Sequence, residues 1–226
     1  MLIVAIPKSA STALLATLGR LHGCYAVQTN FFELPVHDDY AALARFHFDQ
    51  HELTRGIVDK LVEPDGISKN HIVPTPHNQA LLAEHPKVIL LREPTEVIKA
   101  YRRAVSAVDH DIEGLARCFE GCDTESEWLE RAASTGLLQS LQKFYDGWQE
   151  HAGDKLIIRY DELIAEPQET VNRIEDYFGL QRSDEVKLVR ARYTRSRVKN
   201  TVKRLLKRAR LLEAAEQIYA RVRRRS

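Results

Sequence analysis

The sequence predicts an α/β fold, a single domain in which helices flank a central parallel sheet. Short apolar segments of strand length alternate along the chain with segments of helical periodicity, which is the pattern of such a sheet. The length of 226 residues fits one domain better than two. Hydrophobic residues make up 44% of the chain and charged residues 29%, which is typical of a soluble globular protein with a sizeable core.

The N-terminal half contains most of the predicted strands. Residues 2–6 and 87–92 are apolar runs typical of buried parallel strands. Pro94 suits the first turn of a helix, whereas Pro74 and Pro76 are expected to break regular structure. In chain order we expect a strand at 2–6, a helix at 10–21, a strand at 24–28, a helical stretch capped by Asp38 and Asp39 with Leu43, Phe46 and Leu53 among its apolar positions, strands at 66–70 and 87–92, and a helix from Glu93 and Pro94 to about 108.

The C-terminal half is predicted to be mainly helical. One long helical region is expected from Glu125 to His151, followed by a strand at 155–159. The next helix is expected from Pro167 to Phe178, with Gly179 at its C-cap. After Ser183 the chain is predicted to be helical again.

The net charge of +1 conceals a strong asymmetry along the chain. Residues 187–226 contain 15 Lys and Arg against two Asp and Glu, whereas residues 1–186 contain 18 basic and 30 acidic side chains. We therefore predict a domain at 1–186 and a basic helical extension at 187–226, packed on the domain or projecting from it.

Residues 201–225 within this extension carry apolar side chains every three or four positions, which predicts an amphipathic helix. Its basic face leaves three interpretations open: docking on the acidic domain, contact with an anionic membrane surface or lipid-linked acceptor, and contact with an anionic glycan. No nucleic-acid partner is expected, because aromatic residues do not interleave with the basic ones.

The three cysteines argue against a disulfide scaffold. Cys118 and Cys122 lie at helical spacing, but no nearby His or Cys pair completes a metal site, so reduced thiols are expected.

The chain lacks an apolar run of transmembrane length, and its N-terminal run is too short for a signal peptide. We expect a cytoplasmic location, with the basic extension able to contact the inner face of the membrane.

The segment from Pro7 to Thr12 lies between the first strand and the first helix. Backbone N–H groups at a helix N-terminus bind anions, and Lys8 and the hydroxyl side chains add donors. The alternative is an ordinary Ser and Thr helix cap beside a solvated Lys. The segment is not a Walker A motif, because the pattern G-x-x-x-x-G-K-[ST] is absent.

Four segments resemble, in order and approximate spacing, sulfotransferases that use 3′-phosphoadenosine 5′-phosphosulfate (PAPS) as sulfuryl donor. Residues 7–13 resemble their phosphosulfate-binding loop, with the usual pattern P-K-[ST]-G-[ST]-[ST]-x, and residues 88–101 resemble their strand, Arg, Pro and helix. Residues 156–167 are similar to their strand followed by Tyr-Glu-Asp-Leu, and residues 174–180 to the helix end that follows. The resemblance covers most of the chain and implies a P-loop-like phosphosulfate-binding loop.

By this resemblance the chain has a donor site with two phosphate subsites. Lys8 would contact the bridging oxygen and the transferring sulfuryl group, and Arg92 would pair with the 3′-phosphate. Tyr160 falls where the family places a Tyr near the adenine; the alternative is a core aromatic at a strand end. Backbone and hydroxyl donors to the 5′-phosphate would come from Ser9, Ala10, Ser11 and Thr12.

The sequence departs from the family pattern at several positions. Ala10 replaces the loop Gly, so the loop must accommodate a methyl group and is expected to keep a negative φ there. Ala100 stands where a Ser usually contacts the 3′-phosphate, which leaves two alternatives: Arg102 or Arg103 compensates from the same helix, or the chain binds the donor more weakly. Ala13 replaces a Trp that often stacks on adenine. The R-K-G segment is not evident, although residues 195–200 are basic and lie in about the right place.

The segment from Ser68 to Pro74 resembles the K-T-H-L-P segment of cytosolic sulfotransferases. This resemblance implies that His71, with a near-neutral pKa, is the base and that Lys69 assists it. Residues 30–33 show some likeness to glycan sulfotransferases, whose base is a Glu, so Glu33 is the alternative base.

The predicted function is transfer of a sulfuryl group from PAPS to a hydroxyl of a glycan, lipid or small-molecule acceptor. No metal is expected, because Lys8 and Arg92 supply the positive charge that Mg²⁺ supplies in kinases. Two alternatives remain: a non-catalytic nucleotide-binding protein of the same fold, for which Ala10, Ala13 and Ala100 speak, and a P-loop-like small-molecule kinase.

Overall fold

The computed structural model describes residues 1–27, 29, 37–44, 51–106 and 117–189. Its centre is a five-stranded sheet with the order β2-β3-β1-β4-β5, in which every pairing is parallel. The strands are β1 (Leu2–Ala5), β2 (Tyr25–Ala26), β3 (Gly66–Asn70), β4 (Lys87–Leu91) and β5 (Leu156–Arg159). The predicted α/β class and parallel sheet are confirmed.

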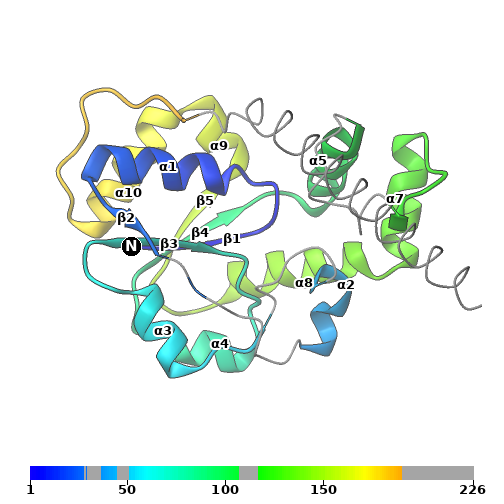
Figure 1. The fold of residues 1–226 in the computed structure, drawn as a ribbon, viewed down its shortest axis with the longest axis horizontal. Coiled ribbons are helices and arrows are strands. Elements are labelled where there is room, and N and C mark those ends of the chain that lie inside the picture. Colours follow the sequence, from blue (N-terminus) through cyan, green and yellow to red (C-terminus); the bar gives the residue numbers. More distant parts are fainter. Residues whose placement is uncertain (28, 30–36, 45–50, 107–116, 190–226) are drawn as a thin grey trace, which may run out of the picture.

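Helices cover both faces of this sheet (Figure 1). α1, α9 and α10 lie on one face, and α3, α4 and α8 lie on the other. The helical elements are α1 (Ser11–His22), the 3₁₀ turn η1 (Asp38–Tyr40), α2 (Ala41–Ala44), α3 (Arg55–Leu61), α4 (Pro76–Leu81), α5 (Pro94–Ser106), α7 (Glu125–Ser134), α8 (Leu137–Glu150), α9 (Tyr160–Ala165) and α10 (Pro167–Phe178).

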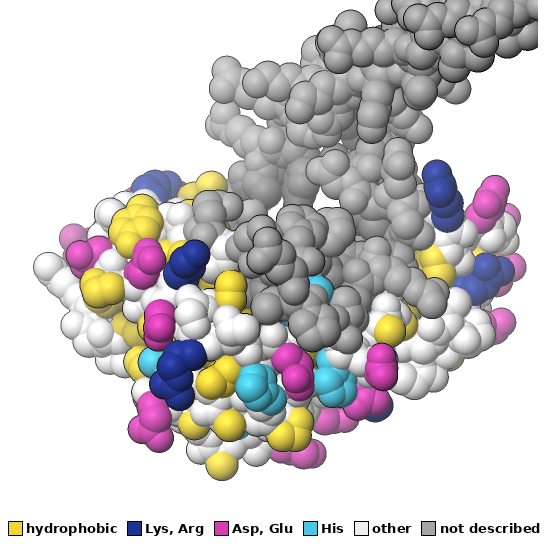
Figure 2. All heavy atoms as spheres, turned by 60° about the horizontal axis from the view of Figure 1, so that its bottom comes forward, with side chains coloured by type: hydrophobic (Ala, Val, Ile, Leu, Met, Phe, Trp, Pro, Cys, Tyr) yellow, Lys and Arg dark blue, Asp and Glu magenta, His cyan; other side chains and the backbone are white. Residues whose placement is uncertain are grey.

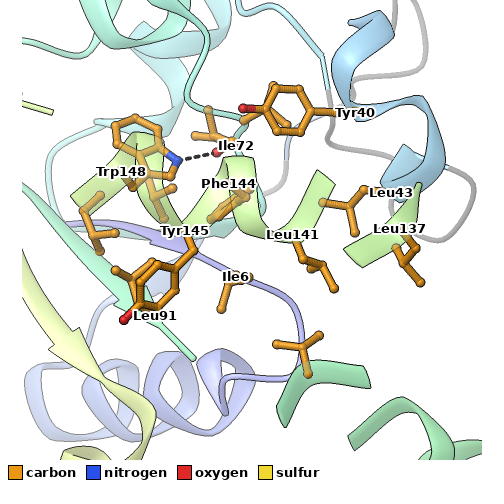
Figure 3. Close-up of a cluster of buried hydrophobic side chains, with 14 of the residues drawn as sticks. Ile6, Tyr40, Leu43, Ile72, Leu91, Leu137, Leu141, Phe144, Tyr145 and Trp148 are labelled. Carbon is orange, nitrogen blue, oxygen red and sulfur yellow. Dashed lines mark hydrogen bonds between the residues drawn. The ribbon is translucent and has the colours of Figure 1, made fainter. Parts of the chain in front are cut away.

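The alternation of side chains along the strands produces two hydrophobic cores. Leu2 and Val4 of β1 pack in the larger cluster, on the α8 face, whereas Ile3 and Ala5 pack in the smaller one with α1 and α10. Figure 3 shows part of the larger cluster, in which the indole N–H of Trp148 donates to a backbone carbonyl at 2.7 Å. Both faces of the neighbouring strands β1 and β4 are therefore buried, which explains why β1 and residues 88–91 of β4 are uninterrupted apolar runs.

Four expected elements differ from the structure. Leu53, predicted to belong to the helical stretch that starts at Asp38, lies outside any helix, just before α3 begins. The predicted helix from Glu125 to His151 is two helices, because Gly136 adopts a φ of 77° between α7 and α8. Pro76 does not break the chain; it begins α4, where a missing N–H costs nothing, after the N-cap Thr75. The helix predicted after Ser183 is absent as far as residue 189.

The cap predicted at Asp38 and Asp39 is also different. His37 occupies the N-cap of η1, and its side chain accepts from the backbone N–H of Asp39. The carboxylate of Asp39 instead pairs with Lys143 of α8, with 2.5 Å between Nζ and Oδ1. The predicted C-cap Gly179 is confirmed, with a φ of 64°.

The described part of the segment after α10 lies against α1. The backbone N–H of Val189 donates to the hydroxyl of Thr17 at 2.9 Å, and Arg20 donates to the carbonyl of Lys187 at 3.1 Å. The domain boundary at 186 and 187 stays a prediction.

On the face shown in Figure 2, acidic, basic and hydrophobic side chains are interspersed over the described surface. None of the helices in the described ranges has the length and apolarity needed to cross a bilayer.

Candidate active site

The predicted site residues come together because each follows a strand of the parallel sheet. The carboxyl ends of β1, β3, β4 and β5 lie at one edge, and they are followed by Lys8, His71, Arg92 and Tyr160 respectively. From β1 the chain goes to the β2 side of the sheet, and from β4 it goes to the β5 side. In open α/β sheets, ligands bind at the crevice where connections diverge in this way.

The loop between β1 and α1 has two residues in the left-handed region. Lys8 has a φ of 60° and Ala10 a φ of 64°, so the expected negative φ at Ala10 is wrong. The loop has only a few residues in which to turn from β1 into α1, and it accepts a strain of about 1–2 kcal/mol at a non-glycine residue. This geometry makes the loop a candidate nest of backbone N–H groups for an anion.

The N-terminus of α1 lacks a side-chain cap. Ala10 occupies the N-cap position and offers no side-chain hydrogen bond, so the first N–H groups of this 12-residue helix are not satisfied by a cap. Ser9 is buried, and its hydroxyl donates to the carbonyl of Ile6 at 2.6 Å. In this conformation Ser9 therefore stabilises the turn, and the alternative of an ordinary Ser or Thr cap is not the geometry observed.

Arg92 lies between the loop after β1 and Tyr160, the residue that follows β5. Its side chain is buried, and Nη1 donates to the carbonyl of Lys8 at 2.7 Å. The guanidinium carbon lies 3.8 Å from the centroid of the Tyr160 ring, which is stacking distance. Nε is buried and has no hydrogen-bond partner among the described residues. Burial lowers the pKa of Arg92 from its ordinary value.

The structure distinguishes the two arginines expected to compensate for Ala100. Arg102 donates to the carbonyl of Asp123 at 2.8 Å, before α7. Arg103 is exposed on α5, and its charge lowers the pKa of Arg92, so the two guanidinium groups are near one another. Of the two arginines, only Arg103 is thus a candidate second cation beside Arg92.

His71 is held in one orientation beside the loop. It is buried, and its Nδ1 lies 2.6 Å from the carbonyl oxygen of Ala5, so this nitrogen carries the proton and donates. Burial, followed by the charge of Lys69 and then that of Lys8, lowers the pKa of His71 to about 3. The expected near-neutral pKa is thus wrong. The ring is neutral at pH 7, and Nε2 is the ring nitrogen that carries no proton.

Sequence reasoning missed the aromatic residues that approach the site from α5 and α8. The Nζ of Lys8 lies 5.6 Å from the ring centroid of Tyr101, which is buried. Tyr145 of α8 bonds to Glu93 and to Arg159, the residues next to Arg92 and Tyr160. Tyr101 ends the segment 88–101 that resembles the strand, Arg, Pro and helix of sulfotransferases, whereas no sequence pattern indicated Tyr145.

Several predicted features lie outside the described residues. They include Glu33, the basic stretch at 195–200 and the amphipathic helix at 201–225. Within the described ranges, no group of three or more His, Cys, Asp or Glu side chains is arranged to hold a metal ion. Cys118 and Cys122 are free thiols, as predicted.

Among solved structures, the chain is similar to several sulfotransferases. The chain is similar to mouse sulfotransferase SULT7A1 complexed with PAP, with a TM-score of 0.53 and 14% identity over 81% of this chain and 59% of that chain. It is also similar to a sulfotransferase from Alicyclobacillus acidocaldarius (TM-score 0.46, 10% identity, 84% of each chain). A third similar structure is the sulfotransferase domain from the curacin biosynthetic pathway (TM-score 0.47, 15% identity, 81% of this chain and 74% of that chain).

Sequence comparison gives the family. No curated protein sequence matches the chain. The chain spans 59% of the length of the mouse protein, and at 14% identity this likeness bears on the fold alone. The family described as "Sulfotransferase domain", however, matches residues 1–219, which include all four strand ends of the site. The resemblance seen in the motifs is therefore confirmed, and the chain belongs to the sulfotransferase family.

Proposed function

We propose that this protein transfers a sulfuryl group from PAPS to a hydroxyl of an acceptor. The observation that carries the proposal is the placement of Arg92. Its buried guanidinium bonds to the loop carbonyl, stacks on Tyr160 and keeps one N–H without a protein partner in the described structure. This arrangement, beside an uncapped helix N-terminus, suits a donor with two separate phosphate groups.

The donor is proposed to bind with its 5′-phosphosulfate at the N-terminus of α1. The backbone N–H groups of residues 9–12 and the exposed Thr12 hydroxyl would face the phosphate, and Lys8 would contact the bridging oxygen. The 3′-phosphate would bind Arg92, with Arg103 as the second cation. The PAP bound to the mouse sulfotransferase supports a nucleotide of this class.

The transfer is proposed to be an in-line displacement at sulfur. The acceptor oxygen forms a bond to sulfur while the bond between sulfur and the bridging oxygen breaks, so that 3′-phosphoadenosine 5′-phosphate (PAP) leaves. The acceptor proton goes to Nε2 of His71, which the Nδ1 bond to Ala5 leaves as the acceptor nitrogen. Lys8 stabilises the charge that grows on the bridging oxygen, and Lys69 assists at the same centre.

The acceptor is proposed to carry a hydroxyl on a glycan, a lipid or a small molecule. The basic residues in 187–226 support a further proposal, that a cytoplasmic form of the protein contacts an anionic membrane surface where a lipid-linked acceptor would lie. Vesicle sedimentation with and without anionic lipid tests this part separately, and equal binding to neutral vesicles would contradict it.

Calorimetry with PAP and with adenosine 5′-phosphate tests the donor site. We expect the wild type to prefer PAP and Arg92→Ala to lose most of that preference, a loss of roughly 30-fold or more for a buried Arg and phosphate pair. Arg182→Ala is the matched control, because Arg182 forms an exposed ion pair with Asp176. A wild type that binds both nucleotides equally would contradict the proposal.

Turnover with labelled PAPS then separates an enzyme from a binding protein. Lys8→Ala should lower kcat far more than it weakens PAP, because the charge on the bridging oxygen develops in the transition state. Tight binding of PAP without turnover on a panel of hydroxyl acceptors would favour a non-catalytic nucleotide-binding protein.

A further inference from the structure

The ends of β4 and β5 are joined by side chains on both faces of the sheet. Leu91 and Arg159 form the last pair of the parallel ladder between these strands. Beyond that pair, Arg92 stacks on Tyr160 at 3.8 Å, whereas Glu93 Oε1 lies 3.6 Å from Nη1 of Arg159. Successive side chains of a strand point to opposite faces, so two neighbouring pairs hold the same two strand ends.

Tyr145 completes the second pair from α8. Its hydroxyl donates to Oε1 of Glu93 at 2.7 Å and accepts from Nη1 of Arg159. Gln149, one helical turn further along α8, has its Oε1 3.4 Å from Nη2 of Arg159. Glu93, Tyr145 and Arg159, which we call the strand-end cluster, therefore connect α8 to the two strand ends.

The anchor of the strand-end cluster is rigid. Tyr145 is buried, and Phe144 and Trp148 beside it on α8 are fully buried in the larger core (Figure 3). Burial, followed by the hydrogen bond to Glu93, raises the pKa of Tyr145 from its ordinary value, so the hydroxyl keeps its proton. Glu93 and Arg159 alone are about half exposed, and an exposed pair contributes little to stability. The hydroxyl of the buried Tyr145 is what fixes both side chains.

We propose that the strand-end cluster positions Arg92 and Tyr160 for the 3′-phosphate of the donor nucleotide. This inference rests on the proposed function, because it concerns the nucleotide that Arg92 binds. The backbone ladder ends at Leu91, so the peptide that carries Arg92 is not held by strand pairing. Fixing Glu93 fixes the adjacent residue, and fixing Arg159 does the same for Tyr160.

The function of the cluster is thus selectivity for the 3′-phosphate and not direct contact with it. A guanidinium that is already oriented loses less conformational entropy on binding a phosphate. Removal of the Tyr145 hydroxyl should therefore weaken nucleotides with a 3′-phosphate and leave other nucleotides nearly unchanged.

The test is Tyr145→Phe, which keeps the buried ring and removes one hydroxyl. By calorimetry, its affinity for PAP should fall about tenfold, because the hydrogen bonds to Glu93 and from Arg159 are both lost and part of that cost falls on the orientation of Arg92. Its affinity for adenosine 5′-phosphate should change less than about twofold. The ratio of the two affinities is the decisive quantity, because a general loss of stability would lower both together.

Tyr177→Phe is the matched control. The Tyr177 hydroxyl also joins a strand to a carboxylate, since it accepts from the backbone N–H of Lys87 and donates to Asp154 at 2.7 Å. It lies at the amino end of β4, opposite the site. This variant should lower Tm without changing the ratio of the two affinities.

Glu93→Gln gives a second measurement if Tyr145→Phe folds poorly. The amide still accepts from Tyr145 but lacks the charge that pairs with Arg159, so the ratio should fall by a smaller amount, about threefold. A wild type without preference for PAP would overturn the proposed function and this inference together. A wild type that prefers PAP, with the full preference retained in both variants, would overturn the positioning inference alone.

Discussion

Replacement of His71 tests whether the folded protein keeps this imidazole neutral. The ring is buried, and its pKa of about 3 lies far below the ordinary 6.5 because the surroundings disfavour its charged form. As the pH falls below about 6.5, the imidazole of His71 therefore takes up a proton in the unfolded chain but stays neutral in the folded chain. Stability from this group is fully present above pH 6.5 and is lost as the pH falls toward 3.

The magnitude follows from the difference between the two pKa values. Each pKa unit corresponds to about 1.4 kcal/mol, so the folded protein should lose as much as about 5 kcal/mol between pH 7 and pH 3 through His71 alone. His71→Asn removes the titrating ring and retains an N–H that can donate to the carbonyl of Ala5. The other titrating groups are common to both proteins and cancel in the comparison.

Urea unfolding at pH 7, 6, 5 and 4 measures this difference. The wild type should lose about 1.4 kcal/mol more than His71→Asn for each pH unit below about 6. Parallel stability curves for the two proteins would refute the reasoning, because they would mean that the folded state tolerates a charged imidazole at this position.

The same property sets the pH dependence of turnover. A base that is already neutral at pH 5 produces no acidic limb near pH 6.5, so kcat should stay level as the pH falls through 6. His71→Ala should lower kcat by roughly two to four orders of magnitude at every pH in this range. A limb near 6.5 that disappears in His71→Ala would show that the imidazole titrates normally when the donor is bound.

Three further variants test other parts of the structure. Arg103→Ala should weaken PAP about three- to tenfold by calorimetry, whereas the neighbouring Arg102→Ala, which loses only a bond to a carbonyl, should not. Ala10→Gly should raise the free energy of unfolding by about 1 kcal/mol by relieving the left-handed φ, and Ala13→Gly within α1 should lower it by a similar amount. Lys87→Met should cost about 3–5 kcal/mol without changing PAP affinity, because the buried ammonium donates to three carbonyls at the edge opposite the site.

The fold was predictable from the sequence because strands that are buried on both faces of a parallel sheet are continuous apolar runs. The residues of β1 and β4 are apolar on both faces, so each strand appears as a continuous run. The break between α7 and α8 was not predictable in the same way. Gly136 is tolerated inside many helices, and only its positive φ, set by how α7 and α8 pack on one another, ends the first helix.

The predictable part of the site has one physical origin. Lys8, His71, Arg92 and Tyr160 each follow a strand, and the carboxyl ends of parallel strands meet at one edge whatever the intervening sequence. Correct strands were therefore enough to bring these residues together. Tyr145 reaches the same edge from the middle of a helix, and its position depends on how α8 packs on the sheet.

The corrections at Ala10 and His71 arise from the same limit. A backbone φ in a short loop is set by the two elements that the loop joins, and the pKa of His71 is set first by burial in the folded chain and then by the charges of Lys69 and Lys8. Residue type alone favours a negative φ for alanine and a pKa near 6.5 for histidine. Ala10 lies in the loop between β1 and α1, and His71 is buried beside that loop, where its Nδ1 donates to the carbonyl of Ala5. A strained loop and a neutral imidazole in one small region agree with the proposal of an anion site beside a proton acceptor.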